Sequence, residues 1–233
     1  MRIFGRGFNF SEDGPGNRLV YHLAGCNMHC PWCSNPEGMD GLAGKDYSVG
    51  EILDECVRSR PMFFEGGGVT FTGGEATLWH TELSELLRGL QAEGIHTAIE
   101  TNATSDRLCE LSPYIDYLIM DFKHFDPQRH KQATGVDNTH IFENLSRLLK
   151  ERQQLHVRIP LINGFNADDP EVFASFFSTL DTSCCVFEFL PYHEYGKEKW
   201  KTPYQIRDGF ITPEILKSFE DTFRAHHLIT VKT

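Results

Sequence analysis

Residues 25–36 read GCNMHCPWCSNP and place three cysteines, Cys26, Cys30 and Cys33, within eight residues in the spacing C-x3-C-x2-C. A tight loop that also contains two prolines offers little core for thiols, so we expect the three thiolates to converge on one metal centre. A [4Fe–4S] cluster normally takes four Cys ligands, one for each iron. Three ligands leave one iron open, in the way that a catalytic zinc site keeps one position free for substrate.

A structural zinc site is the alternative for these cysteines. His22, His29 or a further cysteine could complete such a site. Structural zinc sites more often use paired C-x2-C elements, and this sequence has one such pair. The cluster is therefore the favoured interpretation. The remaining cysteines are expected to be buried, inert thiols: Cys56, Cys109, Cys184 and Cys185.

The composition is that of an ordinary globular protein. With 233 residues, 40% of them hydrophobic and 24% charged, the chain is expected to form a single domain, residues 1–233. No apolar run follows the amino end, and none reaches the about 18 residues of a membrane span, so no secretory signal and no membrane segment are predicted. Seven cysteines, an odd number, fit a cytoplasmic, reducing compartment better than a disulfide framework. The net charge of −11 argues against nonspecific binding of nucleic acid.

Strand-like and helical patterns alternate along the chain. Apolar, β-branched and aromatic runs predict strands at Leu19–Ala24, Val69–Thr72, Thr97–Thr101, Tyr117–Phe122, His156–Ile162 and Val186–Leu190. Ser48 and Glu51 form a capping box that opens a helix to about Ser59, a weaker helical pattern covers residues 105–111, and further helices are predicted at about residues 80–93, 138–152, 170–180 and 213–226. Such alternation predicts an α/β fold of parallel strands joined by right-handed crossovers. About six units rather than eight favour a partial or open barrel.

Polar residues gather at the carboxyl ends of these predicted strands, where barrel enzymes build their active sites. The cysteine loop follows the first strand and His193 follows the sixth. In between, the strand ends carry Gly73-Gly74-Glu75, Thr101-Asn102, and Asp121 with Lys123. Segments that are distant in sequence should therefore converge on one rim.

Four further segments narrow the interpretation: Asp13-Gly14-Pro15-Gly16, residues 66–76 (GGGVTFTGGEA), residues 120–123 (MDFK) and residues 190–197 (LPYHEYGK). Together with the cysteine loop they resemble the glycyl-radical-enzyme activating enzymes of the radical S-adenosylmethionine (SAM) superfamily. The resemblance runs from about Gly14 to Trp200. It implies a partial (β/α)6 TIM-like barrel of the radical SAM type with parallel strands, a [4Fe–4S] cluster on the three cysteines, and SAM as a second cofactor.

The resemblance also implies which residues bind SAM. Trp32 and Ser34 match positions that contact the adenine, and Gly73-Gly74-Glu75 matches the segment that binds the methionine amino group. The Asp121-Phe122-Lys123 segment is also assigned to SAM binding, with His193 near the methionine carboxylate. A cationic side chain facing a carboxylate is reasonable, because charge-assisted hydrogen bonds are the stronger ones. The alternatives are a capping role for Glu75 and a solvated ion pair for Asp121 and Lys123.

Three more positions carry implied roles. Glu100-Thr101-Asn102 matches an Asp-Thr-Asn segment that implies a monovalent-cation site together with Asp121, although Glu100 is longer than the Asp. Arg158, on the fifth predicted strand, matches an Arg that lies near SAM or the substrate backbone. The alternative is a purely structural role, in which Arg158 is a buried charge paired with another side chain. Asp13 matches an acidic position that meets the loop of the protein substrate, and alternatively only starts a Pro-Gly turn.

The sequence departs from the family pattern in three places. Ser34 stands where the pyruvate formate-lyase-activating members carry His, so the target protein could differ. Ala103, rather than Gly, follows Asn102. Residues 38–46 contain no cysteine-rich, ferredoxin-like insert, so one cluster is expected.

The implied activity is reductive cleavage of SAM and abstraction of an α-hydrogen from a glycine of a partner, a glycyl radical enzyme. A flavodoxin or a ferredoxin would be the electron donor. A radical SAM enzyme that acts on a small molecule or a peptide would share every cluster and SAM residue, and is the second hypothesis. A noncatalytic, zinc-stabilised interaction module is the third.

Overall fold

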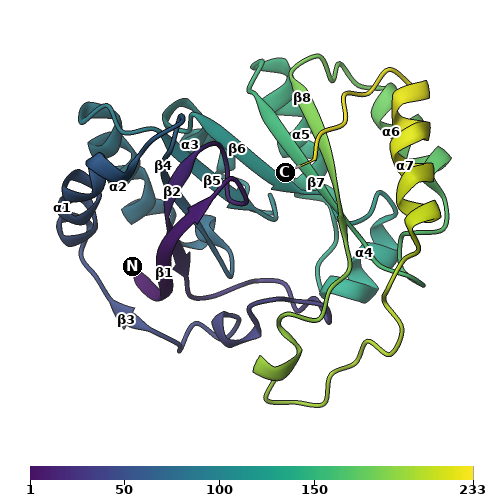
Figure 1. Cartoon of the computed structure of the whole chain (residues 1–233), viewed down its shortest axis with the longest axis horizontal. Helices are drawn as coiled ribbons and strands as arrows, with labels where there is room; N and C mark the ends of the chain where they lie inside the picture. Colours follow the sequence, from purple (N-terminus) through teal and green to yellow (C-terminus); the bar gives the residue numbers. More distant parts are fainter. Residues whose placement is uncertain (233) are drawn as a thin grey trace.

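The computed structural model describes residues 1–232 and forms one open, eight-stranded sheet with helices along its outer side (Figure 1). The strand order is β3-β1-β2-β4-β5-β6-β7-β8. The six strands β2 and β4 to β8 run parallel in the order of the chain. The strands are β1 (Arg2–Phe10), β2 (Asn17–Leu23), β3 (Lys45–Asp46), β4 (Gly68–Gly73), β5 (Thr97–Thr101), β6 (Tyr117–Asp121), β7 (Leu155–Leu161) and β8 (Cys185–Pro191).

All six predicted strands are present, which confirms the open α/β barrel. These six strands are parallel, as expected, and the sequence patterns missed two further strands, β1 and β3. β1 pairs antiparallel with β2 and with β3, and so extends the sheet beyond its first parallel strand. Its sequence, RIFGRGFNF, contains two glycines and leaves Phe8 and Phe10 about half exposed. β3 covers only Arg2 and Ile3, so the rest of β1 has an unpaired outer side, and a strand in that position needs little burial and carries a weak hydrophobic pattern.

The predicted helices are also present, and one was missed. The capping box is confirmed, because the Ser48 hydroxyl accepts from the Glu51 N–H while the Glu51 carboxylate accepts from the Ser48 N–H at 2.8 Å. The helix that the patterns missed is α4, which Asp126 caps. The helices are α1 (Val49–Ser59), α2 (His80–Ala92), α3 (Leu108–Leu111), α4 (Pro127–Thr134), α5 (Thr139–Lys150), α6 (Pro170–Ser178) and α7 (Pro213–Ala225).

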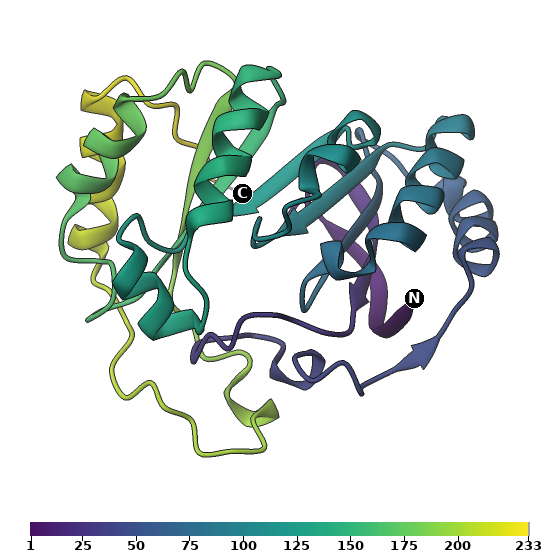
Figure 2. The same cartoon turned by 180° about the vertical axis from the view of Figure 1, so that it is seen from behind.

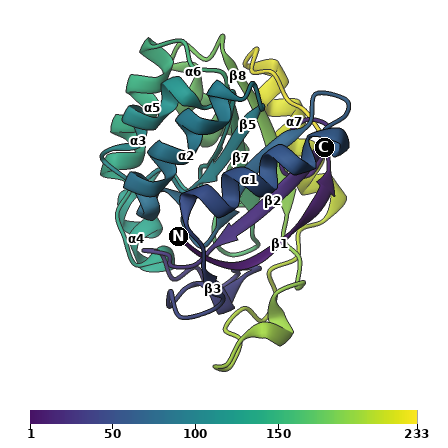
Figure 3. The same ribbon diagram turned by 90° about the vertical axis from the view of Figure 1, so that its left-hand side faces the viewer.

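The apolar core lies between the sheet and these helices. Figure 3 shows α1 and α2 side by side over the first strands. At the other end of the sheet, the ring of Phe177 in α6 lies 4.7 Å from that of Phe187 in β8, and Phe187 lies 5.3 Å from Phe223 in α7. Full burial of each such aromatic side chain stabilises the fold by about 2–3 kcal/mol. No helix within residues 1–232 has the length and apolarity required to cross a membrane.

The inner side of the sheet is polar. It carries buried charged side chains, such as Arg158 on β7 and Glu188 on β8, which are 5% and 3% exposed. The loop after β2, which contains the three cysteines, crosses beneath the carboxyl ends of the strands toward α4 (Figure 2). The N–H of His29 in this loop donates to the carbonyl of Thr134 at the end of α4, at 2.8 Å. The polar inner side of the open barrel and the cysteine loop therefore meet at the carboxyl ends of the strands.

Candidate functional site

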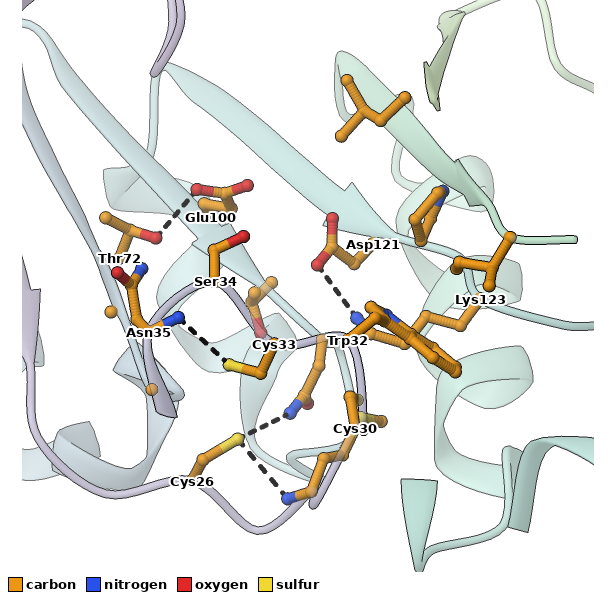
Figure 4. A pocket seen from close by; sticks show the side chains of 18 of the residues that line it. Cys26, Cys30, Trp32, Cys33, Ser34, Asn35, Thr72, Glu100, Asp121 and Lys123 are labelled. Carbon is orange, nitrogen blue, oxygen red and sulfur yellow. Dashed lines mark hydrogen bonds and ion pairs between the residues drawn. The ribbon is translucent and has the colours of Figure 1, made fainter. Parts of the chain in front are cut away.

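A cavity of about 290 Å³ opens at the carboxyl ends of the parallel strands (Figure 4). Its wall combines the cysteine loop with the ends of β4, β5, β6, β7 and β8. Eleven of the predicted site residues line it: Cys26, Cys30, Trp32, Cys33, Ser34, Gly73, Gly74, Asn102, Asp121, Lys123 and His193. The convergence on one rim that the strand ends predicted is therefore confirmed.

The three cysteines are held by the backbone of their own loop. The N–H groups of Met28 and Asn35 donate to the sulfurs of Cys26 and Cys33, each at 3.4 Å. The Cys33 N–H donates to the carbonyl of Cys30 at 3.1 Å, which closes a turn between the second and third cysteines. Hydrogen bonds to cysteine sulfurs are among the features that tune iron–sulfur clusters. The loop thus presents its thiols to the cavity with such donors already in place.

The three cysteines can bind a metal cluster only as thiolates. Burial raises the pKa of Cys26 to about 11 and that of Cys30 to about 12, so a bound metal must displace their protons. Among residues 1–232, no group of three or more His, Cys, Asp or Glu side chains is arranged to hold a single metal ion. Three ligands of a four-iron cluster bind different irons and need not meet at one point. The donor set fits a [4Fe–4S] cluster better than the zinc site considered above.

A buried ion pair faces the thiols. The Lys123 ammonium lies 2.9 Å from the carboxylate of Asp121, and the side chain of Lys123 is only 8% exposed. Burial opposes the charge of Lys123, but the Asp121 carboxylate together with the nearby Cys30 and Cys26 raises the pKa of this lysine. Both residues line the cavity (Figure 4), so Lys123 is a fixed positive charge beside the cysteine loop rather than part of a solvated surface pair.

Gly73 and Gly74 bring two backbones together. A Cβ atom at Gly73 would collide with the backbone of Leu23, and one at Gly74 would collide with the carbonyl of Gly25. The N–H of Gly74 donates to the carbonyl of Leu23 at 2.8 Å. The missing Cβ atoms therefore let the end of β4 pack directly against the start of the cysteine loop, while both glycines still line the cavity.

Glu75 does not line the cavity. Its carboxylate is 1% exposed and accepts hydrogen bonds from the Thr77 N–H, the Thr101 hydroxyl and the Asn102 N–H, at 3.0, 2.6 and 2.7 Å. This is the capping role that was the alternative for Glu75, extended to the neighbouring strand. Phe122 also lies away from the cavity, because its fully buried ring packs against Phe177 at 4.8 Å.

Asn102 connects the end of β5 to the cysteine loop. Its side-chain amide donates to the Asn27 side chain at 3.0 Å and approaches the Cys26 sulfur at 4.0 Å. The next residue, Ala103, has a φ of 58°, a conformation that glycine adopts more easily. This explains why a glycine suits the position after Asn102 and shows that alanine is accommodated here.

Trp32 and His193 both line the cavity. Trp32 packs against Phe165, with ring centroids 4.7 Å apart. His193 lies just beyond β8, and burial lowers its pKa. Its ring is stacked on that of Tyr195 at 4.2 Å, and Tyr195 is 82% exposed. Tyr195 lies in the segment 190–197 that carries the family resemblance, but it was not among the predicted site residues.

A second cavity of about 610 Å³ adjoins the first on the inner side of the sheet. Residues that border both cavities, among them Ser34, Glu100 and His193, form the boundary between them. Asp13 and Arg158 line this second cavity rather than the first. The structure thus divides the predicted site residues between two connected spaces.

Arg158 is fixed by two ion pairs and one hydrogen bond to a backbone carbonyl, on three different segments. Its guanidinium donates to Glu188 at 2.8 Å, to Glu100 at 3.0 Å and to the carbonyl of Glu12. Burial opposes its charge, but the two carboxylates raise its pKa. Because Glu100 is paired with Arg158 and Asp121 with Lys123, the monovalent-cation site stays a prediction.

The segment after β8 contains residues that sequence patterns missed. Trp200 donates from its indole N–H to the carbonyl of Cys33 at 3.3 Å, and Lys199 donates to the carbonyl of Ser34 at 3.1 Å. These residues lie more than 160 positions from their partners along the chain. No local pattern could have found them.

Comparison with known proteins agrees with this arrangement. The profile of the Radical SAM superfamily matches residues 20–177. The chain is 34% identical to the pyruvate formate-lyase-activating enzyme of Staphylococcus epidermidis and 33% identical to that of Staphylococcus aureus, each over 211 residues that cover 84% of both chains.

Solved structures show the same fold. A domain of pyruvate-formate lyase-activating enzyme from Bacteroides vulgatus superposes with a TM-score of 0.59 and 27% identity, covering 71% of this chain and 98% of that one. SuiB from Streptococcus suis, bound to S-adenosylmethionine, superposes with a TM-score of 0.72 and 12% identity over 92% of this chain and 49% of that one, which shows a shared fold alone. The chain therefore belongs to the radical SAM superfamily and, within it, to the glycyl-radical-enzyme activating enzymes related to pyruvate formate-lyase-activating enzyme.

Proposed function

We propose that this protein cleaves SAM reductively at a [4Fe–4S] cluster and installs a glycyl radical on a partner enzyme. The observation that carries the proposal is the shared boundary of the two cavities. The first holds the three thiols and Lys123, the second holds Asp13 and Arg158, and both reach Ser34 and His193. This layout suits an enzyme that makes a radical in one space and uses it in the next.

Cys26, Cys30 and Cys33 would hold three of the four irons. When bound, the cluster supplies the electron that breaks the S–C5′ bond of SAM, giving methionine and a 5′-deoxyadenosyl radical that takes the α-hydrogen of a glycine and leaves a glycyl radical and 5′-deoxyadenosine. The protein's part is to bind, to orient and to exclude water. Its own acids and bases are not required to break a C–H bond.

Lys123 and His193 would bind the methionine part of SAM. The Lys123 ammonium is a permanent positive charge in the first cavity and suits a carboxylate. The backbone at Gly73 and Gly74 suits the amino group, since carbonyl oxygens accept from an ammonium. In this proposal Glu75 acts indirectly, by holding the backbone of Asn102 in place. Trp32 and Ser34 would contact the adenine.

The second cavity would receive the glycine-bearing loop of the partner. Asp13 and Arg158 offer one negative and one positive side chain to polar groups of that loop. Holding the glycine beside the boundary residues would bring its α-carbon close to the bound SAM, and such positioning accounts for selectivity. A flavodoxin or a ferredoxin as electron donor stays a prediction, as do a cytoplasmic location and a single domain.

The test is anaerobic reconstitution of the protein with iron and sulfide, followed by reduction in the presence of SAM. We expect about four irons per chain and release of 5′-deoxyadenosine. Addition of a candidate glycyl radical enzyme should then give a glycyl-radical signal in electron paramagnetic resonance (EPR). Deoxyadenosine without that signal, for every candidate partner, would favour the alternative of a small-molecule or peptide substrate.

Cys30→Ala provides the matched negative control. Without this ligand we expect both iron binding and SAM cleavage to be lost. Cleavage that survives in Cys30→Ala would refute the ligand assignment. Colourless wild-type protein that holds one zinc would instead support the zinc-stabilised module.

A further inference from the structure

The turn that follows β8 folds back onto the cysteine loop. Its short helix, η5 (Lys197–Lys199), brings Lys199 to the loop, where the ammonium donates to the carbonyl of Ser34 and to the side-chain oxygen of Asn35, both at 3.1 Å. The next residue, Trp200, donates its indole N–H to the carbonyl of Cys33 at 3.3 Å. Two consecutive side chains thus form hydrogen bonds with the backbone at and beside the third cysteine.

Two further contacts support this interaction. Lys199 also forms an ion pair with Glu37 at 3.3 Å, one turn farther along the loop. Gly196 packs so closely against Cys33 and Ser34 that an added Cβ atom would lie within 3 Å of both backbones. The approach is therefore a close backbone contact reinforced by side chains rather than an incidental meeting of two surface loops. We refer to Gly196, Lys199 and Trp200 as the clasp.

The clasp joins two segments that line the first cavity. One wall is the end of the cysteine loop, Cys33–Asn35, and the other is the segment Leu190–His193 at the end of β8. No strand pairing holds these walls together, because one segment lies in the loop after β2 and the other at the end of β8, and β2 and β8 are not neighbours in the open sheet. The clasp is a direct link between them, and it lies next to His193 in sequence.

We propose that Lys199 and Trp200 are positioning residues that set the distance between the cysteine loop and His193, and so fix how tightly SAM is held. The inference rests on the assignment of this cavity to SAM and the cluster. Neither side chain lines the cavity, so neither would touch SAM directly. Each acts through the backbone of residues 33–35.

The test uses the reconstituted holoenzyme with the variants Lys199→Met and Trp200→Phe. Each removes hydrogen-bond donors while keeping most of the apolar side chain. The loss of each hydrogen bond should raise the Kd and the KM for SAM about threefold to tenfold. The iron content should stay at the wild-type value, because all three thiols remain.

A spectroscopic readout separates positioning from simple loss of stability. SAM binding to the open iron changes the EPR signal of a reduced cluster. In the variants, a higher SAM concentration should be required to produce this change, and the EPR signal at saturating SAM should be broader than in the wild type. Lys199→Arg keeps a cationic donor and should restore most of the affinity. Lys197→Met is the matched control, since Lys197 lies on the same turn but pairs with Glu194 at 2.8 Å.

The outcomes are distinct. Unchanged SAM affinity and an unchanged EPR signal in Lys199→Met, Trp200→Phe and the double variant would overturn the proposal. Equal weakening by Lys197→Met would also overturn it, because the effect would then belong to the turn as a whole. A wild-type protein that binds no cluster would instead refute the proposed function. Gly196→Ala, which forces the two backbones apart, should weaken SAM binding at least as much as either side-chain variant.

Discussion

The carboxylate of Glu75 accepts a hydrogen bond from the backbone N–H of Asn102 at 2.7 Å, so a residue that follows β4 fixes the end of β5. The same carboxylate holds the Thr101 hydroxyl. Asn102 in turn donates to Asn27 in the cysteine loop. The rim of the barrel is therefore one connected structure, in which a buried acidic residue supports a segment that lines the cavity.

Replacement of Glu75 should lower the stability of the fold rather than affect SAM binding alone. Glu75→Ala leaves several buried donors without an acceptor, and we expect the free energy of unfolding to fall by about 3 kcal/mol. Denaturant unfolding of the metal-free protein measures this directly. Glu85→Gln, an exposed position on α2, is the control and should change little. A stable Glu75→Ala protein that has lost only SAM binding would show instead that Glu75 binds the cofactor.

Lys123→Met should weaken SAM binding and retain the iron. The substitution removes the fixed positive charge and leaves Asp121 without its partner at 2.9 Å. We expect SAM affinity to fall at least about tenfold, as is typical when one partner of a buried charge pair is truncated. Equilibrium binding to the reconstituted protein is the measurement, with the exposed lysine of α4 changed in Lys131→Met as the control. Wild-type affinity in Lys123→Met would rule out its role toward the carboxylate.

Tyr195 should contribute to partner recognition without affecting SAM. Its ring is exposed, lines the second cavity and stacks on His193. Exposed aromatic residues beside a cavity are frequent anchors of protein interfaces. Tyr195→Ala should therefore raise the KM for the partner about fivefold, while Tyr195→Phe keeps the wild-type value. Production of deoxyadenosine in the absence of the partner should be the same in all three proteins. An unchanged KM in Tyr195→Ala would show that the partner does not cover this ring.

Stability should fall as the pH decreases below neutrality. Burial and the nearby Arg129 lower the pKa of His124 to about 4, whereas an unfolded histidine titrates near about 6.5. Between these two values the unfolded state binds a proton that the folded state does not, so stability decreases by at most about 1.4 kcal/mol per pH unit for this group. His22, His96, His130 and His193, whose pKa values burial also lowers, add to the same trend.

His124→Asn isolates the part that His124 contributes. The ring nitrogen of His124 accepts from the Asp126 N–H at 2.8 Å, and an asparagine oxygen can accept a similar bond without titrating. The variant should show a shallower decrease of stability between about pH 6.5 and pH 4. Chemical denaturation at several pH values measures the slope. Equal slopes in both proteins would mean that His124 is not the group that responds.

Ala103 should accept glycine but not valine. Its φ of 58° is left-handed, and a β-branched side chain is especially strained there. Ala103 is fully buried, so Ala103→Val also overfills the core, and we expect a loss of about 2 kcal/mol or more. Ala103→Gly should change stability by less than about 1 kcal/mol, because relief of strain offsets the lost methyl group. Thermal unfolding distinguishes the two, and a stable Ala103→Val protein would contradict the backbone argument.

Local patterns in the sequence were sufficient for much of the fold. The six parallel strands, six of the helices and the capping box at Ser48 follow from hydrophobic periodicity and end signals, because buried strands and amphipathic helices impose such patterns on neighbouring residues. The patterns failed at β1, β3 and α4. β1 contains two glycines and is paired on its outer side only at Arg2 and Ile3, β3 has two exposed residues, and α4 is short and mostly polar, so each has little burial to impose a pattern.

The cysteine loop, the succession of the parallel strands and the polar strand ends can all be read from local spacing in the chain, because that spacing is preserved when the chain folds. The inward orientation of Glu75, the pairing of Arg158 with Glu100 and Glu188, and the contacts of Lys199 and Trp200 with residues 33–35 became visible only in the folded protein. Such contacts link residues far apart in the chain, and their energies depend on burial and charge pairing that arise only when the sheet has formed.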